Sequence, residues 1–324
     1  MTRTTLSPPA PPVAVAGFAA DVRHFLTQRP RQLPSRYLYD EVGSALFEVI
    51  CVLPWYPLTR AEMRLLDRHA REILDAATTT IVELGSGSGA KLSALIAGAG
   101  SDRTHLDVHL VDVSGSALAE AGRALEAHAE VRVVPHRATY EAGLEEFRRV
   151  RPAAGRRMAV FLGSNLGNFD PPGRDLFLRA VRASLDRGDA LLLGVDLVKP
   201  EAALLQAYDD PLGVTAAFNR NLLARINHEL GGDFDLRGFA HRAVWNQAAS
   251  RVEMHLVSGR SQRITVPGSD LAFVLEPGET IWTESSYKYR PAEILATLER
   301  SGFGVRSLWI EPADRFALTL AEAT

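Results

Sequence analysis

The segment Ile81–Lys91, which reads IVELGSGSGAK, constrains the fold of this chain more than any other stretch. An apolar strand pattern ends there on an acidic residue and runs into three alternating glycines, after which a helical pattern begins. Glycine has no Cβ and tolerates positive φ, so such a turn lets the backbone come close to a nucleotide-like ligand. The segment therefore predicts an α/β enzyme that binds a cofactor at the turn after the first strand of its sheet.

The composition is that of an ordinary globular protein and argues against a strongly charged partner. The chain has 324 residues, 46% of them hydrophobic, and its 36 Lys and Arg residues nearly balance 39 Asp and Glu residues. This balance predicts no nucleic-acid partner and no membrane partner, and it favours a small-molecule ligand. No apolar stretch approaches the ~20 residues of a membrane helix. We expect a cytoplasmic monomer whose Pro- and Ala-rich residues 1–17 form a disordered leader.

Alternating strand and helix patterns between residues 79 and 197 predict a parallel sheet covered by helices on both faces. The expected strands span 79–84, 105–113, 131–135, 158–163 and 190–195. The expected helices between them begin near residue 91 and span 116–128 and 172–185. This alternation of strands and helices then ends, because helical patterns at 201–208 and 212–230 are followed by several strand patterns without helices between them. A helix over 291–300 and strands over 305–310 and 316–320 return to the sheet.

This segmentation predicts two domains. Residues 60–198 and 287–324 form the cofactor-binding domain around the parallel sheet. Residues 18–59 contain helical patterns but no strand of that sheet, so we assign them, with the insertion 199–286, to a second, largely antiparallel α+β domain. We expect this second domain to cover the carboxyl edge of the parallel sheet, where ligands of open α/β sheets bind.

The glycine-rich turn by itself leaves two classes of cofactor open. Gly85, Gly87 and Ala90 fit the G-x-G-x-x-A fingerprint of dinucleotide-binding dehydrogenases. Glu83, however, stands just before the first glycine, where a dinucleotide-binding strand is usually apolar. An acid followed by three alternating glycines favours the S-adenosylmethionine (SAM) loop of Rossmann-like methyltransferases.

Further polar residues lie where a ligand of such a sheet would bind. Asp112 ends the second predicted strand, where it either accepts hydrogen bonds from two ribose hydroxyls or forms a solvated strand end. Asn168 follows the fourth strand and either binds a ligand or forms an Asx turn before Pro171. Residues 207–221 and 283–290 concentrate polar and aromatic groups, which either bind a small molecule or make a solvated face. The nine histidines have no metal-site spacing, and no G-x-S-x-G elbow is present.

Together these segments resemble the histidine-specific Nα-methyltransferases of ergothioneine biosynthesis over nearly the whole chain after the leader. The matching segments are 37–47 (YLYDEVGSALF), 53–60 (LPWYPLTR), 82–87 (VELGSG), 161–164 (FLGS), 191–199 (LLLGVDLVK), 208–221 and 283–286 (TESS). The resemblance implies a Rossmann-like methyltransferase domain with a mostly parallel sheet and a second α+β domain that binds the substrate. It also implies SAM as the methyl donor.

The resemblance carries site residues over to this chain. The methyl donor is placed against Tyr39, Gly85, Gly87, Lys91, Asp112, Thr139 and Tyr140. The amino acid substrate is placed against Tyr56, Asn168, Tyr208, Glu284 and Ser286. The resemblance implies that Glu284 and Ser286 hold the imidazole and that Asn168 and Tyr208 hold the α-amino and carboxylate end. A buried carboxylate and hydroxyl carry a desolvation cost when an apolar side chain leaves them unpaired, which predicts histidine over phenylalanine.

The expected function is therefore trimethylation of L-histidine to its betaine, hercynine. Methyl transfer from a sulfonium is an in-line displacement in which orientation dominates, so we assign no residue as an acid or a base. Two departures from the family pattern, Trp55 and Thr139, keep another amino acid acceptor open, such as a tryptophan derivative. An NAD-dependent oxidoreductase and a binding module without turnover are the remaining alternatives.

Overall fold

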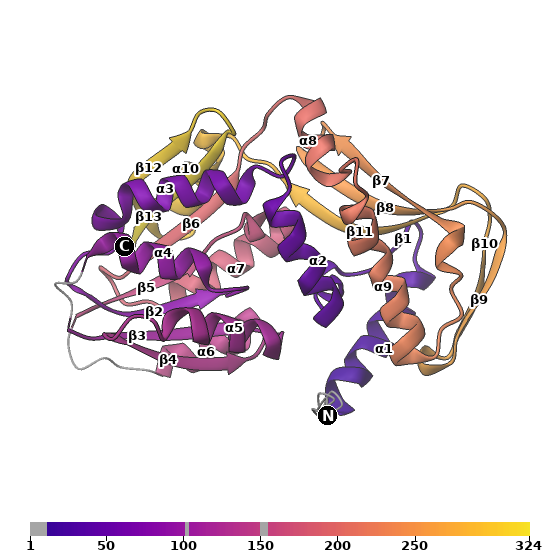
Figure 1. Ribbon diagram of the computed structural model, residues 1–324, viewed down its shortest axis with the longest axis horizontal. Helices are drawn as coiled ribbons and strands as arrows, with labels where there is room; N and C mark the ends of the chain where they lie inside the picture. The colour runs from indigo at the N-terminus through magenta and orange to yellow at the C-terminus, as the bar shows by residue number, and fades with distance from the viewer. Residues whose placement is uncertain (1–11, 101–103, 150–154) are drawn as a thin grey trace, which may run out of the picture.

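The computed structural model describes residues 12–100, 104–149 and 155–324, which form a seven-stranded sheet, a four-stranded sheet and a two-stranded hairpin with their covering helices (Figure 1). The larger sheet has seven strands in the order β12-β13-β6-β5-β2-β3-β4. Its strands are β2 (Thr78–Leu84), β3 (Leu106–Asp112), β4 (Val131–Arg137), β5 (Arg156–Phe161), β6 (Ala190–Asp196), β12 (Phe303–Glu311) and β13 (Phe316–Ala323). Strands β2 to β6 are parallel, whereas β13 is antiparallel to both β6 and β12. The predicted mostly parallel sheet is confirmed.

The burial of each strand follows its place in the sheet. All residues of β6 are buried, and β6 lies near the centre with helices over both faces, which explains its continuous apolar sequence. Strand β4, at the edge, contains no buried residue. Consecutive residues of β2 point to opposite faces, so Ile81 belongs to the core cluster that includes residues of α3, α4 and α5, and Val82 to the cluster that includes residues of α6, α7 and α10. These helices are α3 (Leu58–Ile73), α4 (Ala90–Ala99), α5 (Gly115–Leu125), α6 (Tyr140–Arg149), α7 (Pro171–Ala183) and α10 (Pro291–Arg300).

The second sheet combines the N-terminal segment with the insertion. Its strands, in spatial order, are β1 (Arg31–Gln32), β11 (Thr280–Tyr287), β8 (Arg251–Ser258) and β7 (Phe239–Asn246). Strands β11, β8 and β7 are antiparallel, and β1 joins β11 in parallel. A separate hairpin is formed by β9 (Gln262–Val266) and β10 (Leu271–Leu275). The helices of this part are α1 (Pro12–Thr27), α2 (Glu41–Val52), α8 (Glu201–Tyr208) and α9 (Val214–Leu230), with short 3-10 turns η1 (Ser35–Leu38), η3 (Leu236–Gly238) and η4 (Pro267–Ser269).

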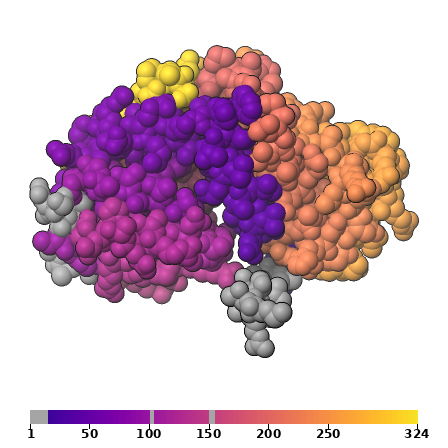
Figure 2. Space-filling view, viewed as in Figure 1, coloured from indigo at the N-terminus to yellow at the C-terminus, as the bar shows by residue number. Residues whose placement is uncertain are grey.

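The two sheets meet where the chain crosses between them. The segment after β6 leads out to α8, and the segment after β11 leads back to α10. Leu197 and Tyr289 form a parallel bridge there, and the Tyr289 N–H donates to the Asp196 carbonyl at 3.1 Å. In the space-filling view the indigo N-terminal part of the chain lies between the magenta sheet domain and the orange insertion (Figure 2). The crossing point and α2 therefore frame the space between the two sheets.

The predicted leader is wrong at its carboxyl end. Helix α1 already includes Pro12, so residues 12–17 are helical, and residues 1–11 of the predicted leader lie outside the described residues. Proline fits the first turn of a helix because the N–H it lacks has no partner there. Among the described residues, no helix combines the length and apolar character that a membrane crossing requires.

Candidate active site

The glycine-rich turn after β2 has the backbone conformation that its sequence requires. Gly85, Gly87 and Gly89 have φ values of 77°, 50° and 74°. A Cβ added to Gly85 would lie 3.0 Å from the Tyr140 hydroxyl, and one added to Gly89 would lie 2.7 Å from the Cα of Ala121. The turn therefore lies close to α5 and Tyr140. The positive φ disfavours a side chain at both glycines, and at Gly89 the backbone of α5 also leaves no space for one.

Asp112 fastens this turn to the end of β3. Its Oδ1 accepts from the Ser114 N–H at 2.9 Å, and its Oδ2 lies 3.4 Å from the Gly87 N–H. Burial raises the pKa of Asp112, and these backbone N–H groups act in the opposite direction. Beside it, Thr139 is exposed and its Oγ1 lies 3.4 Å from the Ala142 N–H at the start of α6. The described contacts of Thr139 thus belong to the helix, and its place in a donor site stays a prediction.

An ion pair with a buried carboxylate lies beside the turn. Lys91 Nζ is 2.7 Å from Glu62 Oε2, and the Glu62 side chain is fully buried. Both Glu62 oxygens accept from the Gly163 N–H, at 3.0 and 2.9 Å. A Cβ on Gly194 would overlap Glu62 Oε1, so this glycine makes room for the carboxylate. Burial also raises the pKa of Glu83 to about 8, and Lys91 opposes this shift.

A cavity lies between the seven-stranded sheet and the four-stranded sheet. Its walls contain all the residues predicted to bind the amino acid, which are Tyr56, Asn168, Tyr208, Glu284 and Ser286. The other lining residues are Tyr39, Phe47, Ile50, Gly163, Ser164, Asn165, Ala207, Thr215, Phe218 and Met254. The structure therefore brings the five predicted residues together from four separate parts of the chain.

The cavity adjoins the glycine-rich turn. Asn165, at the start of η2 (Asn165–Asn168), has its Nδ2 3.3 Å from the position of a Cβ on Gly85. Gly163 lines the cavity as well, and a Cβ on it would lie 3.2 Å from Lys91 Nζ. Tyr39, which we predicted to contact the donor, lies in the cavity wall with the acceptor residues. A ligand at the turn and a ligand in the cavity would therefore be neighbours.

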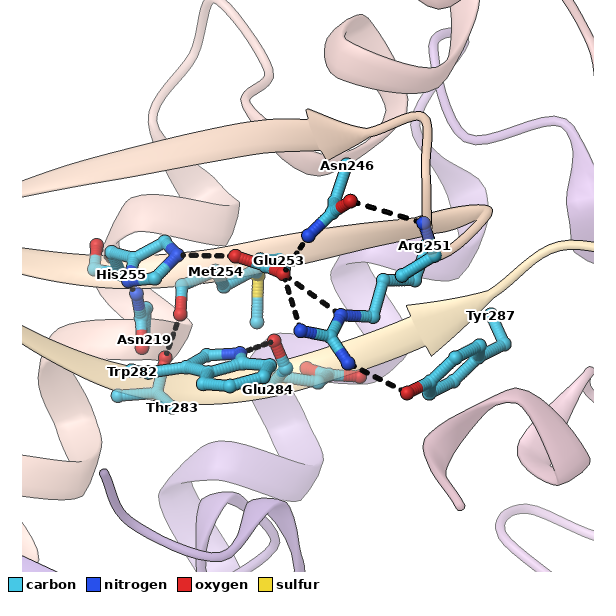
Figure 3. Close-up of polar contacts among 11 residues, drawn as sticks. Asn219, Asn246, Arg251, Glu253, Met254, His255, Trp282, Thr283, Glu284 and Tyr287 are labelled. Atoms are coloured by element: carbon cyan, nitrogen blue, oxygen red, sulfur yellow. Dashed lines mark hydrogen bonds and ion pairs between the residues drawn. The ribbon is translucent and has the colours of Figure 1, made fainter. Parts of the chain in front are cut away.

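A β-bulge in β11 turns Glu284 into the cavity. Trp282 pairs with His255 and Glu284 pairs with Met254, so Thr283 is an extra residue without a partner of its own. In a regular strand Glu284 would lie on the same face as Trp282, which is the outer face. The extra residue reverses this, so that Glu284 lies on the inner face of the sheet. Thr283 Oγ1 donates to the Met254 carbonyl at 3.0 Å, and Trp282 Nε1 donates to the Glu284 carbonyl at 2.8 Å (Figure 3).

A polar cluster supports the bulge on the outer face of the same sheet. The Arg251 guanidinium lies 4.3 Å from the centre of the Trp282 ring. Glu253 holds Arg251 in place, since Arg251 Nε donates to Glu253 Oε1 at 2.8 Å (Figure 3). Asn246 Nδ2 donates to the same oxygen at 2.9 Å, and His255 Nε2 lies 3.1 Å from the other carboxylate oxygen. The cluster therefore fixes the tryptophan whose N–H holds the bulge.

Two cavity hydroxyls share a buried lysine. Tyr208 Oη and Ser286 Oγ are 2.8 Å apart, and Lys288 Nζ donates to them at 2.8 and 2.9 Å. Lys288 is fully buried and also lies 3.0 Å from Asp196 Oδ2, while Lys199 Nζ lies 2.7 Å from Asp196 Oδ1. Burial by itself lowers the pKa of Lys288, but Asp196 and Tyr208 raise it above its ordinary value. Lys288 is therefore a charged ammonium.

Sequence reasoning missed this lysine and its partner, although each had a signal. Lys288 follows Ser286 by two residues, which is the spacing of side chains on one face of a strand. Asp196 is the last residue of an apolar strand, and Asp112 likewise is the last residue of β3. The bulge had no such signal, because nothing in the segment 283–286 shows which residue is the extra one.

Comparisons with known proteins identify the family. A family model described as histidine-specific, SAM-dependent methyltransferases matches residues 18–323. A histidine N-alpha-methyltransferase of Mycolicibacterium smegmatis is 41% identical over 310 residues, which cover 95% of each chain. One from Mycobacterium tuberculosis is 42% identical over 306 residues, which cover 93% of each chain. An L-tryptophan methyltransferase of Psilocybe serbica is 27% identical and covers 89% of this chain and 87% of its own. The chain belongs to the family of SAM-dependent, histidine-specific methyltransferases.

Proposed function

We propose that this enzyme transfers methyl groups from SAM to the α-amino nitrogen of L-histidine and that repeated transfer gives the trimethylated betaine, hercynine. The observation that carries the proposal is the pair formed by Glu284 and Ser286, which the bulge turns into one wall of the cavity. A carboxylate and a hydroxyl there suit the two nitrogens of an imidazole. The names of the two mycobacterial relatives support the same substrate.

The residues at the glycine-rich turn fit the methyl donor. Gly85 has a positive φ that disfavours a side chain, and the buried polar atoms Glu83 Oε2 and Ser86 Oγ have no hydrogen-bond partner among the described residues. We propose that Asp112 receives the ribose hydroxyls and that the Lys91 ammonium faces the carboxylate of the donor. Gly85, Gly87, Tyr39, Thr139 and Tyr140 complete the proposed donor site. When bound, SAM supplies an electrophilic methyl group.

The cavity residues orient the acceptor amine. We propose that Asn168 and Tyr208, with Tyr56 beside them, hold the α-amino and carboxylate end of histidine. The cavity removes water from a neutral amine and restricts its approach, and such positioning accounts for about 7–11 kcal/mol of barrier lowering in well-oriented reactions. A Cβ on Gly167 would lie 2.7 Å from the Tyr287 carbonyl, so η2 rests directly on β11 and holds Asn168 close to Ser286.

The two-domain division of the chain is part of the same proposal. Residues 60–198 and 287–324 would bind the donor, and residues 18–59 and 199–286 would bind the acceptor. The pairing of β1 with β11 supports this division, since it joins the N-terminal segment to the insertion in one sheet. A monomer that acts in the cytoplasm remains a prediction from the sequence.

A tryptophan-type acceptor is the second candidate. The cavity is lined by Phe47, Ile50, Phe218 and Met254, which would also suit a larger aromatic ring. The L-tryptophan methyltransferase relative supports this alternative at lower identity. An indole N–H would satisfy Glu284 as an imidazole N–H does, but an indole has no second ring nitrogen for Ser286.

Labelled SAM and a panel of free amino acids test the proposal. We expect label in histidine, with products of one, two and three added methyl groups in the mass spectrum. Turnover of tryptophan with no turnover of histidine would select the second candidate. Binding of S-adenosylhomocysteine without methyl transfer to any amino acid would indicate a binding protein without turnover and would contradict both candidates.

A further inference from the structure

We propose that Lys288 is a positioning residue that fixes the direction of the hydrogen bonds at the acceptor site and so makes Ser286 a donor to the substrate ring. This inference rests on the proposed function, because it concerns how the same cavity selects its amino acid. Lys288 does not line the cavity. It lies behind the cavity wall, where the chain crosses between the two sheets, and acts through Tyr208 and Ser286.

The ammonium group has a partner for each of its hydrogens. A lysine ammonium has three hydrogens and cannot accept. Lys288 Nζ has Asp196 Oδ2 at 3.0 Å, Tyr208 Oη at 2.8 Å and Ser286 Oγ at 2.9 Å. Both hydroxyl oxygens must therefore accept from Lys288. Neither hydroxyl can donate to that lysine, so each must direct its own hydrogen elsewhere.

This arrangement leaves one hydroxyl hydrogen for the ligand. Tyr208 Oη and Ser286 Oγ are 2.8 Å apart, so one of them donates to the other. A phenol, with a pKa of about 10, is more acidic than an aliphatic hydroxyl and is the better donor. We therefore assign Tyr208 as the donor to Ser286. The hydrogen of Ser286 is then free for the ligand, because Ser286 lines the cavity together with Glu284.

The cavity wall then has one hydrogen-bond acceptor and one hydrogen-bond donor for the substrate ring. Ionised Glu284 only accepts hydrogen bonds, and Ser286 in this network donates one. A neutral imidazole matches both groups, because one ring nitrogen carries a hydrogen and the other has a lone pair. An indole or a pyrrole has the N–H but no bare nitrogen, so the Ser286 hydrogen would lose its partner in the desolvated site. Lys288 thereby acts on substrate choice from outside the cavity.

Lys288 also acts on the charge of Glu284. Burial raises the pKa of Glu284 to about 7, and the Lys288 charge opposes this rise. The phenols of Tyr39 and Tyr56 also interact with Glu284, and burial raises their pKa values well above the ordinary value, so both phenols are neutral. Removal of the lysine charge would therefore favour the protonated carboxyl, which is a poorer acceptor.

Lys288→Met and Lys199→Met form a matched pair of variants. Each replaces one of the two lysines that face Asp196 and leaves the other in place, so Asp196 keeps a cation in both variants. Only Lys288 contacts the cavity hydroxyls. For Lys288→Met we expect KM for histidine to rise about 10-fold or more. The preference for histidine over tryptophan should fall, and the pH midpoint of histidine binding should move up. Lys199→Met should change none of these.

Binding of S-adenosylhomocysteine checks that each variant is folded, and it should match the wild type. Equal effects of the two variants, or a wild-type KM and pH midpoint in folded Lys288→Met, would overturn the role of Lys288. A measurement on the unaltered enzyme gives a second test. Pyrrolylalanine, whose ring has an N–H but no bare nitrogen, should react at least about tenfold less efficiently than histidine. Equal efficiency would overturn the inference, whereas failure to methylate histidine at all would overturn the proposed function instead.

Discussion

The indole Nε1 of Trp282 donates a hydrogen bond to the carbonyl oxygen of Glu284 at 2.8 Å, across the bulge of β11. This contact links a ring on the outer face of the sheet to a carboxylate in the cavity. The bulge puts Glu284 and Ser286 on the same inner face. The geometry of the acceptor site therefore depends on residues that the substrate does not touch.

Trp282→Phe should weaken histidine turnover without changing the donor site. Phenylalanine keeps an aromatic ring for Arg251 but has no N–H for the Glu284 carbonyl. One neutral hydrogen bond contributes about 0.5–1.5 kcal/mol, so kcat/KM for histidine should fall about 2- to 10-fold. Trp245→Phe, on β7 of the same sheet, is the control and should have no such effect. An unchanged kcat/KM in Trp282→Phe would show that the bulge holds without this bond.

Glu284→Gln should reduce the affinity for histidine. The amide keeps the shape of the side chain but removes the charge that strengthens a hydrogen bond to an imidazole N–H. Hydrogen bonds to charged groups contribute about 1.5–3 kcal/mol, which corresponds to about a 10- to 100-fold weaker Kd. Calorimetric titration of histidine with S-adenosylhomocysteine present measures the change. Wild-type affinity for histidine in this variant would show that the charge of Glu284 does not contribute to histidine binding.

Histidine affinity should fall as the pH decreases below about 7. Burial raises the pKa of Glu284 to about 7, so the carboxyl is ionised above this pH and protonated below it. Only the ionised form accepts through both oxygens, and affinity should therefore decrease on the acid side by up to about tenfold per pH unit. Free histidine titrates in the same range. The pH dependence of histidine affinity must therefore be compared between the wild type and Glu284→Gln. Identical pH profiles of the two proteins would show that Glu284 does not cause the loss of affinity.

Gly194→Ala should destabilise the protein. A Cβ at this position would overlap Glu62 Oε1, whose carboxylate is fully buried and holds the Gly163 N–H. Overpacking of a close-packed interior typically costs about 1–3 kcal/mol. Gly122→Ala is the matched control, because this glycine lies in α5 with open space around it and should gain about 0.5–1 kcal/mol. Thermal unfolding measures the stability of both variants. Equal melting temperatures of Gly194→Ala and Gly122→Ala would mean that the Glu62 side chain moves aside without a cost in stability.

The alternation of elements was predictable from the sequence because it follows local patterns. The apolar run of β6 and the predicted helix over 201–208 both occur as expected. Asn168, Tyr208 and Glu284 meet in one cavity, although they are far apart in the sequence. The family resemblance brought these residues together, since periodicity alone contains no information about such distances.

The remaining features depend on tertiary contacts. The Glu62 carboxylate looks like an ordinary charge on an amphipathic helix until Gly163 and Lys91 are seen around it. The extra residue Thr283 is defined only by its pairing with β8. The network of Lys288 likewise requires Asp196, which the sequence places 92 residues earlier, at the other crossing between the sheets.

A crystal structure of the enzyme with S-adenosylhomocysteine and L-histidine tests the central claim most directly. We predict S-adenosylhomocysteine beside Gly85 and Asp112. The imidazole should lie between Glu284 and Ser286, with the α-amino nitrogen directed towards the sulfur. Histidine bound outside this cavity, or an imidazole turned away from Glu284 and Ser286, would contradict the account.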